Sequence, residues 1–222
     1  MSSDQEVILA SLNTHGGRGA DGQPYDLAAA CRQLKADIIA LRSDTDLRSM
    51  GISGETARGR WGVAVLTTMP VAHSEVADLG RTPGDPIGRV AQLITVDVPG
   101  GGKLRVANTH LTHLFASPVQ LLRLVRHLTP ANVPTVITGD LNMPLPLTGL
   151  AAGYAPAVIG RTYSASRPVV QLDHILADRR VIRCGGEVLA PAGSDHLPVR
   201  ARLRLRPCAG EWSGSRRPDP QR

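Results

Sequence analysis

Short apolar segments bounded by turn residues follow one another along almost the whole chain. Runs of this length, rich in Val, Ile and Leu, are typical of buried strands rather than of helices. They predict strands at residues 7–12, 37–41, 63–67, 90–98, 103–110, 135–138, 169–176 and 197–205. A chain with this many strands must bury sheet faces, which restricts it to folds built around β-sheet.

Two segments have helical spacing instead. Asp26 is the expected N-cap of a helix that begins at Leu27. Residues 118–128 carry a proline early, where a missing backbone N–H does no harm. The turn Pro-Gly-Gly-Gly at 99–102 predicts a hairpin between the strands on either side of it. Hairpins alternate with strand–helix–strand units, so we expect mixed β-sheet with helices on its outer faces.

The composition is that of one folded domain with a short tail. The chain has 222 residues, of which 42% are hydrophobic and 20% charged, and most of it is therefore not intrinsically disordered. Residues 207–222 lose all periodicity, so we expect a folded domain at 1–206 and a disordered basic tail after it. Three scattered cysteines, an N-terminus unlike a signal peptide and no membrane-spanning stretch predict a cytoplasmic protein.

The formal net charge of +6 suggests a nucleic-acid partner, but two observations oppose it. Aromatic residues make up 3% of the chain, which leaves little for stacking on unpaired bases. The last 23 residues hold seven basic and two acidic side chains, and 18 basic and 17 acidic residues remain elsewhere. The arginines at 200, 202, 204 and 206 alternate with smaller or apolar residues and predict a solvated stripe on a terminal strand. We therefore expect a small-molecule substrate and no nucleic-acid partner.

Polar residues able to do chemistry lie where the apolar strands stop. They are Asn13, His110, Asp140, Asn142, Asp173, His174, Asp195 and His196. Strand ends at one rim of a sheet bring such groups together although they are distant in sequence. Carboxylate and amide oxygens could hold a hard divalent ion, and carboxylates and imidazoles could form an acid/base pair.

Each of these residues also has a purely structural interpretation. Asp140 and Asn142 occur in a Gly-Asp-Leu-Asn turn, where such side chains often cap backbone groups, and His110 alone is more often packed than catalytic. Asp173 differs, because a carboxylate inside an apolar strand is costly unless it is paired. His174 is expected on the opposite face of that strand. The chain has neither the Walker spacing of a phosphate-binding loop nor a nucleophile elbow.

The order of the motifs is more specific than any one of them. A strand ending in Asn13 is followed by Asp-Ile-Ile-Ala-Leu at 37–41, Trp-Gly at 61–62, Asn-Thr-His-Leu at 108–111, Gly-Asp-Leu-Asn at 139–142, Gln-Leu-Asp-His-Ile-Leu at 171–176 and Ser-Asp-His-Leu-Pro-Val at 194–199. Over residues 7–206 this order resembles the endonuclease/exonuclease/phosphatase superfamily, of which the closing Ser-Asp-His-Leu-Pro is the most specific mark. The resemblance implies a four-layer α/β/β/α sandwich of two mixed β-sheets with outer helices.

The resemblance also implies a role for each catalytic residue. Asp140 would activate the attacking water, and Asn142 would bind the phosphoryl oxygens. His196 would stabilise the transition state, with Asp173 holding it in orientation. His110 matches a histidine that protonates the leaving oxygen in some branches of the superfamily. Phosphoryl transfer depends on such positioning and charge neutralisation more than on covalent chemistry.

The implied metal site is where the sequence departs from the superfamily. Asp195 would be a ligand of Mg²⁺ or Mn²⁺, and Asn13 would lie in the metal and phosphate shell. The superfamily has Leu-Gln-Glu after its second strand, with the glutamate as a principal metal ligand, but this chain has Leu-Arg-Ser at 41–43. Ser43 brings no charge, and Arg42 would disfavour a divalent ion if it points inward. Replacement of the missing carboxylate by the nearby Asp44 and true loss of that ligand are both open.

Three functional hypotheses follow from this mixture of kept and lost residues. The first is a divalent-metal-dependent phosphoesterase or phosphodiesterase acting on a small-molecule or lipid-type substrate. The second is a repurposed member that performs metal-independent acid/base chemistry, such as a cyclisation or a hydrolysis in specialised metabolism. The third is a catalytically silent binding module. Retention of both histidines and all three aspartates of the motifs disfavours the third, and the substrate and the oligomeric state are left open.

Overall fold

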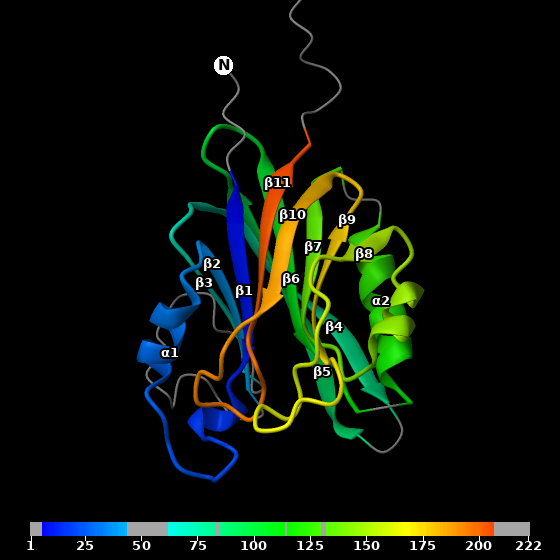
Figure 1. Cartoon of the computed structure of the whole chain (residues 1–222). Coiled ribbons are helices and arrows are strands. Elements are labelled where there is room, and N and C mark those ends of the chain that lie inside the picture. The colour runs from blue at the N-terminus through cyan, green and yellow to red at the C-terminus, as the bar shows by residue number, and fades with distance from the viewer. Residues whose placement is uncertain (1–5, 44–61, 83–84, 114, 130–131, 207–222) are drawn as a thin grey trace, which may run out of the picture.

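Two β-sheets pack face to face, and each carries an α-helix on its outer face (Figure 1). The computed structural model describes residues 6–43, 62–82, 85–113, 115–129 and 132–206. Within these residues the four-layer α/β/β/α sandwich of two mixed sheets is confirmed, with a single α-helix in each outer layer. The predicted tail at 207–222 lies outside the described residues.

The smaller sheet has the strand order β10-β11-β1-β2-β3. It is mixed because β1 and β2 run parallel, whereas the other neighbouring pairs are antiparallel. Its strands are β1 (Val7–Asn13), β2 (Ile38–Arg42), β3 (Val63–Thr67), β10 (Val181–Val188) and β11 (Val199–Leu205). The chain crosses from β1 to β2 through the 3-10 turn η1 (His15–Gly17) and then α1 (Leu27–Leu34), which covers the outer face of this sheet at the left of Figure 1.

The larger sheet has the order β4-β5-β6-β7-β9-β8. Here β6 and β7 are the parallel pair. The strands are β4 (Val71–Thr82), β5 (Asp85–Asp97), β6 (Lys103–His110), β7 (Thr135–Asp140), β8 (Tyr154–Pro156) and β9 (Asp173–Asp178). The crossover from β6 to β7 is α2 (Ser117–Leu128), on the right in Figure 1, and a second 3-10 helix, η3 (Leu145–Leu150), precedes β8.

Local sequence explains where α1 and the β5–β6 hairpin begin and end. Asp26 caps α1, since its carboxylate accepts a hydrogen bond of 2.9 Å from the Ala29 amide, which satisfies one of the free N–H groups of the first turn. The predicted hairpin turn at 99–102 is confirmed, because the Val98 amide donates to the Gly102 carbonyl at 3.0 Å. Gly102 has a φ of 101°, a conformation that favours glycine.

Three apolar layers separate the four structural layers. Residues of β1 show the alternation that creates them, because Leu9 faces the core between the sheets whereas Ala10 and Leu12 face α1. The α2 side of the larger sheet forms the third apolar layer. At one end of the sandwich the core between the sheets becomes polar. The buried inward-facing residues there are Ser11, Asn13, Arg42, Asn108, Thr138, Asp140 and Asp173.

Three strands were not predicted from the sequence, and one strand was predicted to begin too early. The unpredicted strands are β4, β8 and β10, and the strand predicted at 169–176 begins at Asp173. Both β4 and β10 are edge strands, and most of their side chains are at least partly exposed. An edge strand with solvent on one side gives a weak apolar pattern, which explains why periodicity did not find them.

Candidate active site

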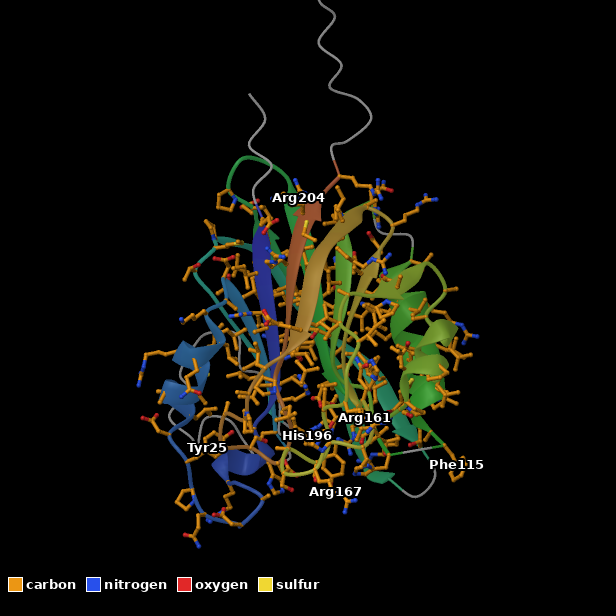
Figure 2. The ribbon with its side chains drawn as sticks, in the orientation of Figure 1. Tyr25, Phe115, Arg161, Arg167, His196 and Arg204 are labelled. Carbon is orange, nitrogen blue, oxygen red and sulfur yellow. The ribbon has the colours of Figure 1, made fainter. Side chains whose placement is uncertain are left out.

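The polar end of the core between the sheets collects residues from both sheets. In the larger sheet, Asp140 ends β7 and lies in register with His110 at the end of β6 and with Asp173 at the start of β9. In the smaller sheet, Asn13 ends β1, and His196 lies shortly before β11. Figure 2 shows His196 at one end of the sandwich, near Arg161 and Arg167, with Arg204 at the opposite end.

Gly139 allows Asp140 to lie beside His110. A Cβ atom at residue 139 would be 1.9 Å from the Thr109 carbonyl oxygen of the neighbouring strand. The φ of Gly139 is 149°, which is also a conformation that other residues rarely adopt. The glycine of the Gly-Asp-Leu-Asn motif is therefore required by the close approach of β6 and β7 at this rim.

Asp173 is fully buried and holds two cationic groups. Its Oδ2 is 2.8 Å from Nδ1 of His196, and its Oδ1 forms an ion pair with Nη2 of Arg42. The amide of Asp173 donates to the hydroxyl of Thr162 at 3.2 Å. Burial alone would raise the pKa of Asp173, but Arg42 and His196 outweigh it and hold the pKa well below its usual range. Asp173 is therefore ionised throughout the physiological range.

Asp140 lies between the two histidines. Its Oδ2 is 3.6 Å from Nε2 of His110 and 3.7 Å from Nε2 of His196. The side-chain amide of Asn13 donates to the same oxygen at 2.9 Å, and the backbone amide of Asn142 donates to Oδ1 of Asp140 at 3.0 Å. Burial, followed by the charge of Asp173, raises the pKa of Asp140. A carboxylate with a raised pKa is a better proton acceptor than an ordinary one.

The charge of His196 is set by the two carboxylates. Burial alone would lower the pKa of its imidazole, but Asp173 and then Asp140 outweigh burial and raise the pKa to about 9. His196 is therefore a cation at neutral pH. The ring of Tyr163 packs on it with a centroid separation of 4.7 Å, which fixes the plane of the imidazole.

The structure brings most of the predicted site residues together. They are Asn13, His110, Asp140, Asn142, Asp173 and His196. The side chain of Asn142 donates to the Leu111 carbonyl at 2.8 Å. Asp195 lies nearer the surface, with 18% of its side chain exposed and Oδ1 3.6 Å from Nδ1 of His15. Asp44 lies outside the described residues.

Two residues of this site were not among the predicted ones. Arg42 was expected only to oppose a metal, yet its guanidinium is fully buried and bonded to Asp173. Alternation along β2 could have indicated this, since Ile38 faces the core between the sheets and Arg42 follows it by four residues. Tyr163 comes from an irregular segment that pairs with His196 through an isolated bridge, and no sequence pattern marks it.

The family model described as the Endonuclease/Exonuclease/phosphatase family matches residues 10–196. The chain belongs to the endonuclease/exonuclease/phosphatase family. Members of this family are hydrolases that act on phosphoesters. No protein in the curated set matches the chain. Within the described residues, no helix has the length and apolar character needed to cross a membrane.

Solved structures of the family share the fold at low sequence identity. An endonuclease/exonuclease/phosphatase family protein from Bacteroides thetaiotaomicron has a TM-score of 0.74 and 16% identity, with 90% of this chain and 95% of that chain covered. The mannosyl-6-phosphatase Bt3783 of the same organism has a TM-score of 0.72 and 16% identity, covering 90% and 100%. An endonuclease/exonuclease/phosphatase from Beutenbergia cavernae has a TM-score of 0.69 and 24% identity, covering 91% and 72%.

The divalent ion that the family generally uses does not fit the donors that the described residues offer. Asp140, Asp173 and His196 have ligand atoms within 4.8 Å of one another and could hold a metal ion by proximity. However, both oxygens of Asp173 are bonded to cationic groups, and both oxygens of Asp140 accept amide hydrogens. Mg²⁺ and Mn²⁺ prefer several free oxygen ligands. Among the described residues, the predicted ligands Asp195 and Asn13 supply one carboxylate and one amide.

Ser43 occupies the position of the family's glutamate. Its hydroxyl accepts a hydrogen bond of 3.1 Å from the Gly16 amide, so the side chain fixes the loop after β1. A small cavity of about 10 Å³ next to it is lined by Ser43, Val63, Arg89, Val90 and His110. Within the part of the chain that the structure describes, this lining includes a guanidinium and an imidazole and no carboxylate. A larger cavity of about 450 Å³, lined by residues such as Tyr154, Asp178 and Arg206, lies at the other end of β9 from Asp173.

Proposed function

We propose that this chain hydrolyses the phosphoester of a small molecule. The observation that carries the proposal is the position of Asp140, a buried carboxylate between His110 and His196, with His196 bonded in turn to the ionised Asp173. Attack of water on phosphorus needs a proton acceptor, a fixed cation and a proton donor close to one point. Asp140, His196 and the imidazole of His110 supply these three groups in turn.

The proposed reaction uses each of these groups once. Asp140 takes a proton from water as the water oxygen bonds to phosphorus. The bond from phosphorus to the ester oxygen breaks, and His110 gives a proton to that oxygen. His196 stays protonated and stabilises the charge on the phosphoryl oxygens in the transition state. The products are an alcohol and a phosphate, and the proton on Asp140 is returned to His110 through solvent.

Charge and the shape of the rim support a small substrate. Outside the last 23 residues the chain is nearly neutral, so it offers little general attraction for a polyanion. Tyr163 is 38% exposed beside His196 and presents a ring face at the rim, and Arg161 and Arg167 lie at the same end of the sandwich (Figure 2). A substrate with an anionic group and a flat or apolar portion suits this rim. One structural neighbour is named as a mannosyl-6-phosphatase, which agrees with a small phosphorylated substrate.

A second candidate is acid/base chemistry on a substrate without phosphate. The observation in its favour is Ser43, which replaces the metal-binding glutamate of the family while the aspartates and histidines remain. The two candidates differ in their product, because only the first releases phosphate or a phosphomonoester.

The test is hydrolysis of p-nitrophenyl phosphate and bis(p-nitrophenyl) phosphate by the full chain. We expect turnover of at least one of them, and we expect Asp140→Asn to lower kcat by about 10²- to 10⁴-fold, the usual contribution of a general base. Asp97→Asn is a matched control, because Asp97 is an exposed aspartate paired with Lys103 at the opposite end of the molecule. Equal activity in Asp140→Asn and wild type would refute the proposal.

A further inference from the structure

Arg42 is a fully buried cation behind the catalytic groups. It is the last residue of β2, and its side chain points between the sheets. Nη1 donates to the hydroxyl of Ser11 at 2.5 Å, and Nη2 is paired with Oδ1 of Asp173. A guanidinium removed from water is costly unless a carboxylate compensates it. The pair with Asp173 is therefore the reason that Arg42 can be buried here.

The pair also determines what Asp173 can do. Arg42 of the smaller sheet holds one oxygen of Asp173 and thereby fixes the orientation of the carboxylate. In this orientation the other oxygen bonds to Nδ1 of His196. The hydrogen bond from the Asp173 amide to Thr162 fixes the backbone at the same point. The side chain of Arg42 bonds to Ser11 and Asp173, so it orients His196 through Asp173.

The oxygens of both buried carboxylates already have partners. Oδ1 of Asp173 is paired with Arg42 and Oδ2 with Nδ1 of His196, and both oxygens of Asp140 accept hydrogen bonds. A divalent ion at the same carboxylates would have to displace these partners, and Arg42 would repel it at short range.

We infer that this site does not need a bound divalent ion, and that the buried Arg42, through its ion pair with Asp173, is the positioning residue for Asp173 and His196. The inference deepens the proposed phosphoester hydrolysis and rests on it. In this site His196 faces the phosphoryl oxygens, and Arg42 fixes the carboxylate that orients it.

Calorimetric titration tests the metal directly and does not depend on activity. We expect the wild-type chain to show no saturable binding of Mn²⁺ up to about millimolar concentration. This limit corresponds to a binding free energy weaker than about −4 kcal/mol. We expect Arg42→Gln/Ser43→Glu, which restores the family's Leu-Gln-Glu, to bind Mn²⁺ at least about tenfold more tightly than wild type. Binding of Mn²⁺ by wild type with a Kd below about 100 µM would overturn the inference.

Kinetics test the positioning role. We expect hydrolysis by wild type to stay within about twofold after dialysis against EDTA, and we expect Arg42→Gln to lower kcat by about 10- to 100-fold with KM nearly unchanged, as for other residues that orient a catalytic group. Arg42→Lys keeps the charge and should recover part of that loss, which a purely steric role would not allow. Arg126→Gln, an exposed arginine on α2, is the matched control.

The outcomes separate this inference from the proposed function. Hydrolysis that disappears with EDTA and returns with Mn²⁺ would confirm phosphoester hydrolysis and overturn the role of Arg42. If neither nitrophenyl ester is hydrolysed, the calorimetric comparison of wild type with Arg42→Gln/Ser43→Glu still decides the inference. If Arg42→Gln does not fold, wild type and Ser43→Glu suffice. Ser43→Glu keeps Arg42, so it should also show no saturable binding of Mn²⁺ up to about millimolar concentration, and tighter binding would overturn the inference.

Discussion

Two aspartates that face each other across one pair of strands have opposite properties in this site. Asp140 and Asp173 are paired in register, and both are buried. Asp173 is compensated by Arg42 and His196, so its pKa is lowered, whereas burial dominates at Asp140 and its pKa is raised. Environments that push the pKa values of two neighbouring carboxylates apart assign them different roles. Asp173 is the permanent anion, and Asp140 is suited to exchange a proton.

The raised pKa of His196 gives the first expected pH dependence. Because the pKa is about 9 in the folded chain against an ordinary value of 6.5, the stabilisation from protonated His196 is complete below pH 6.5 and is lost as pH rises through about 9. The difference in free energy of unfolding between wild type and His196→Gln should therefore shrink over that window, by on the order of 3 kcal/mol.

Urea unfolding at several pH values measures this difference. His127→Gln is the matched control, because its imidazole lies on the surface beside Glu75, and it should follow the pH dependence of wild type. A difference between wild type and His196→Gln that is constant or grows from pH 6.5 to pH 9 would mean that His196 is not held as a cation.

Residue-level prediction from sequence succeeded where a side chain was incompatible with its surroundings. Asp173 was recognised because a buried carboxylate needs a partner, and it has two. The partner Arg42 was not recognised, because its pairing with Asp173 crosses from one sheet to the other and spans 131 residues. Strand alternation gives the face of a residue, but it does not show which residue of the opposite sheet will meet it.

At the scale of elements, sequence patterns found the strands with nearly continuous burial, including the edge strand β3, and missed the edge strands β4, β8 and β10. The predicted bounds of β3 and β6 agree with the structure, since both have nearly continuous burial or clear turn signals. In contrast, β10 contains Gly185 and Gly186 and a register shift, both of which weaken a strand signal. The missed edges do not change the site, because its residues lie on β1, β2, β6, β7 and β9, just after β7, in the segment between β8 and β9, and on the loop before β11.

Asn108 on β6 links the two sheets and provides a test at this scale. Its side-chain amide donates to the carbonyls of Leu41 and Ala64, at 2.8 Å and 3.0 Å, on β2 and β3 of the other sheet. Asn108→Ala should leave both buried carbonyls without this donor and lower the free energy of unfolding by about 3 kcal/mol. Chemical denaturation measures the loss, and a change below about 0.5 kcal/mol would show that water replaces the amide.

For the whole molecule, the expectation that the basic balance does not reflect a nucleic-acid surface stays a prediction. Arginines on the outward side of β11 are engaged locally: Arg200 bonds to Glu187 at 2.9 Å and to the Leu34 carbonyl at 2.8 Å, and Arg204 contacts Cys184 at 3.1 Å. These contacts agree with the predicted stripe on a terminal strand. A stripe that is bonded to its own sheet has fewer donors left for phosphates.

A chain ending at Arg206 should therefore bind duplex DNA weakly. We expect a Kd no tighter than about 10⁻⁴ M near physiological salt, with a shallow dependence on salt concentration. Fluorescence anisotropy of a labelled duplex across a salt series measures both quantities. Micromolar binding that weakens steeply with salt would contradict a small-substrate site and favour a nucleic-acid substrate.

The Arg42–Asp173 pair has a consequence for how activity responds to changes far from the rim. His196 is supported from the smaller sheet and Asp140 from the larger one, and the pair joins the two. Any repacking of the apolar layer between the sheets that slides one against the other must alter the alignment of proton acceptor and cation. We therefore expect the rate of hydrolysis to fall when core substitutions shift one sheet relative to the other, even if those substitutions are too mild to change the melting temperature.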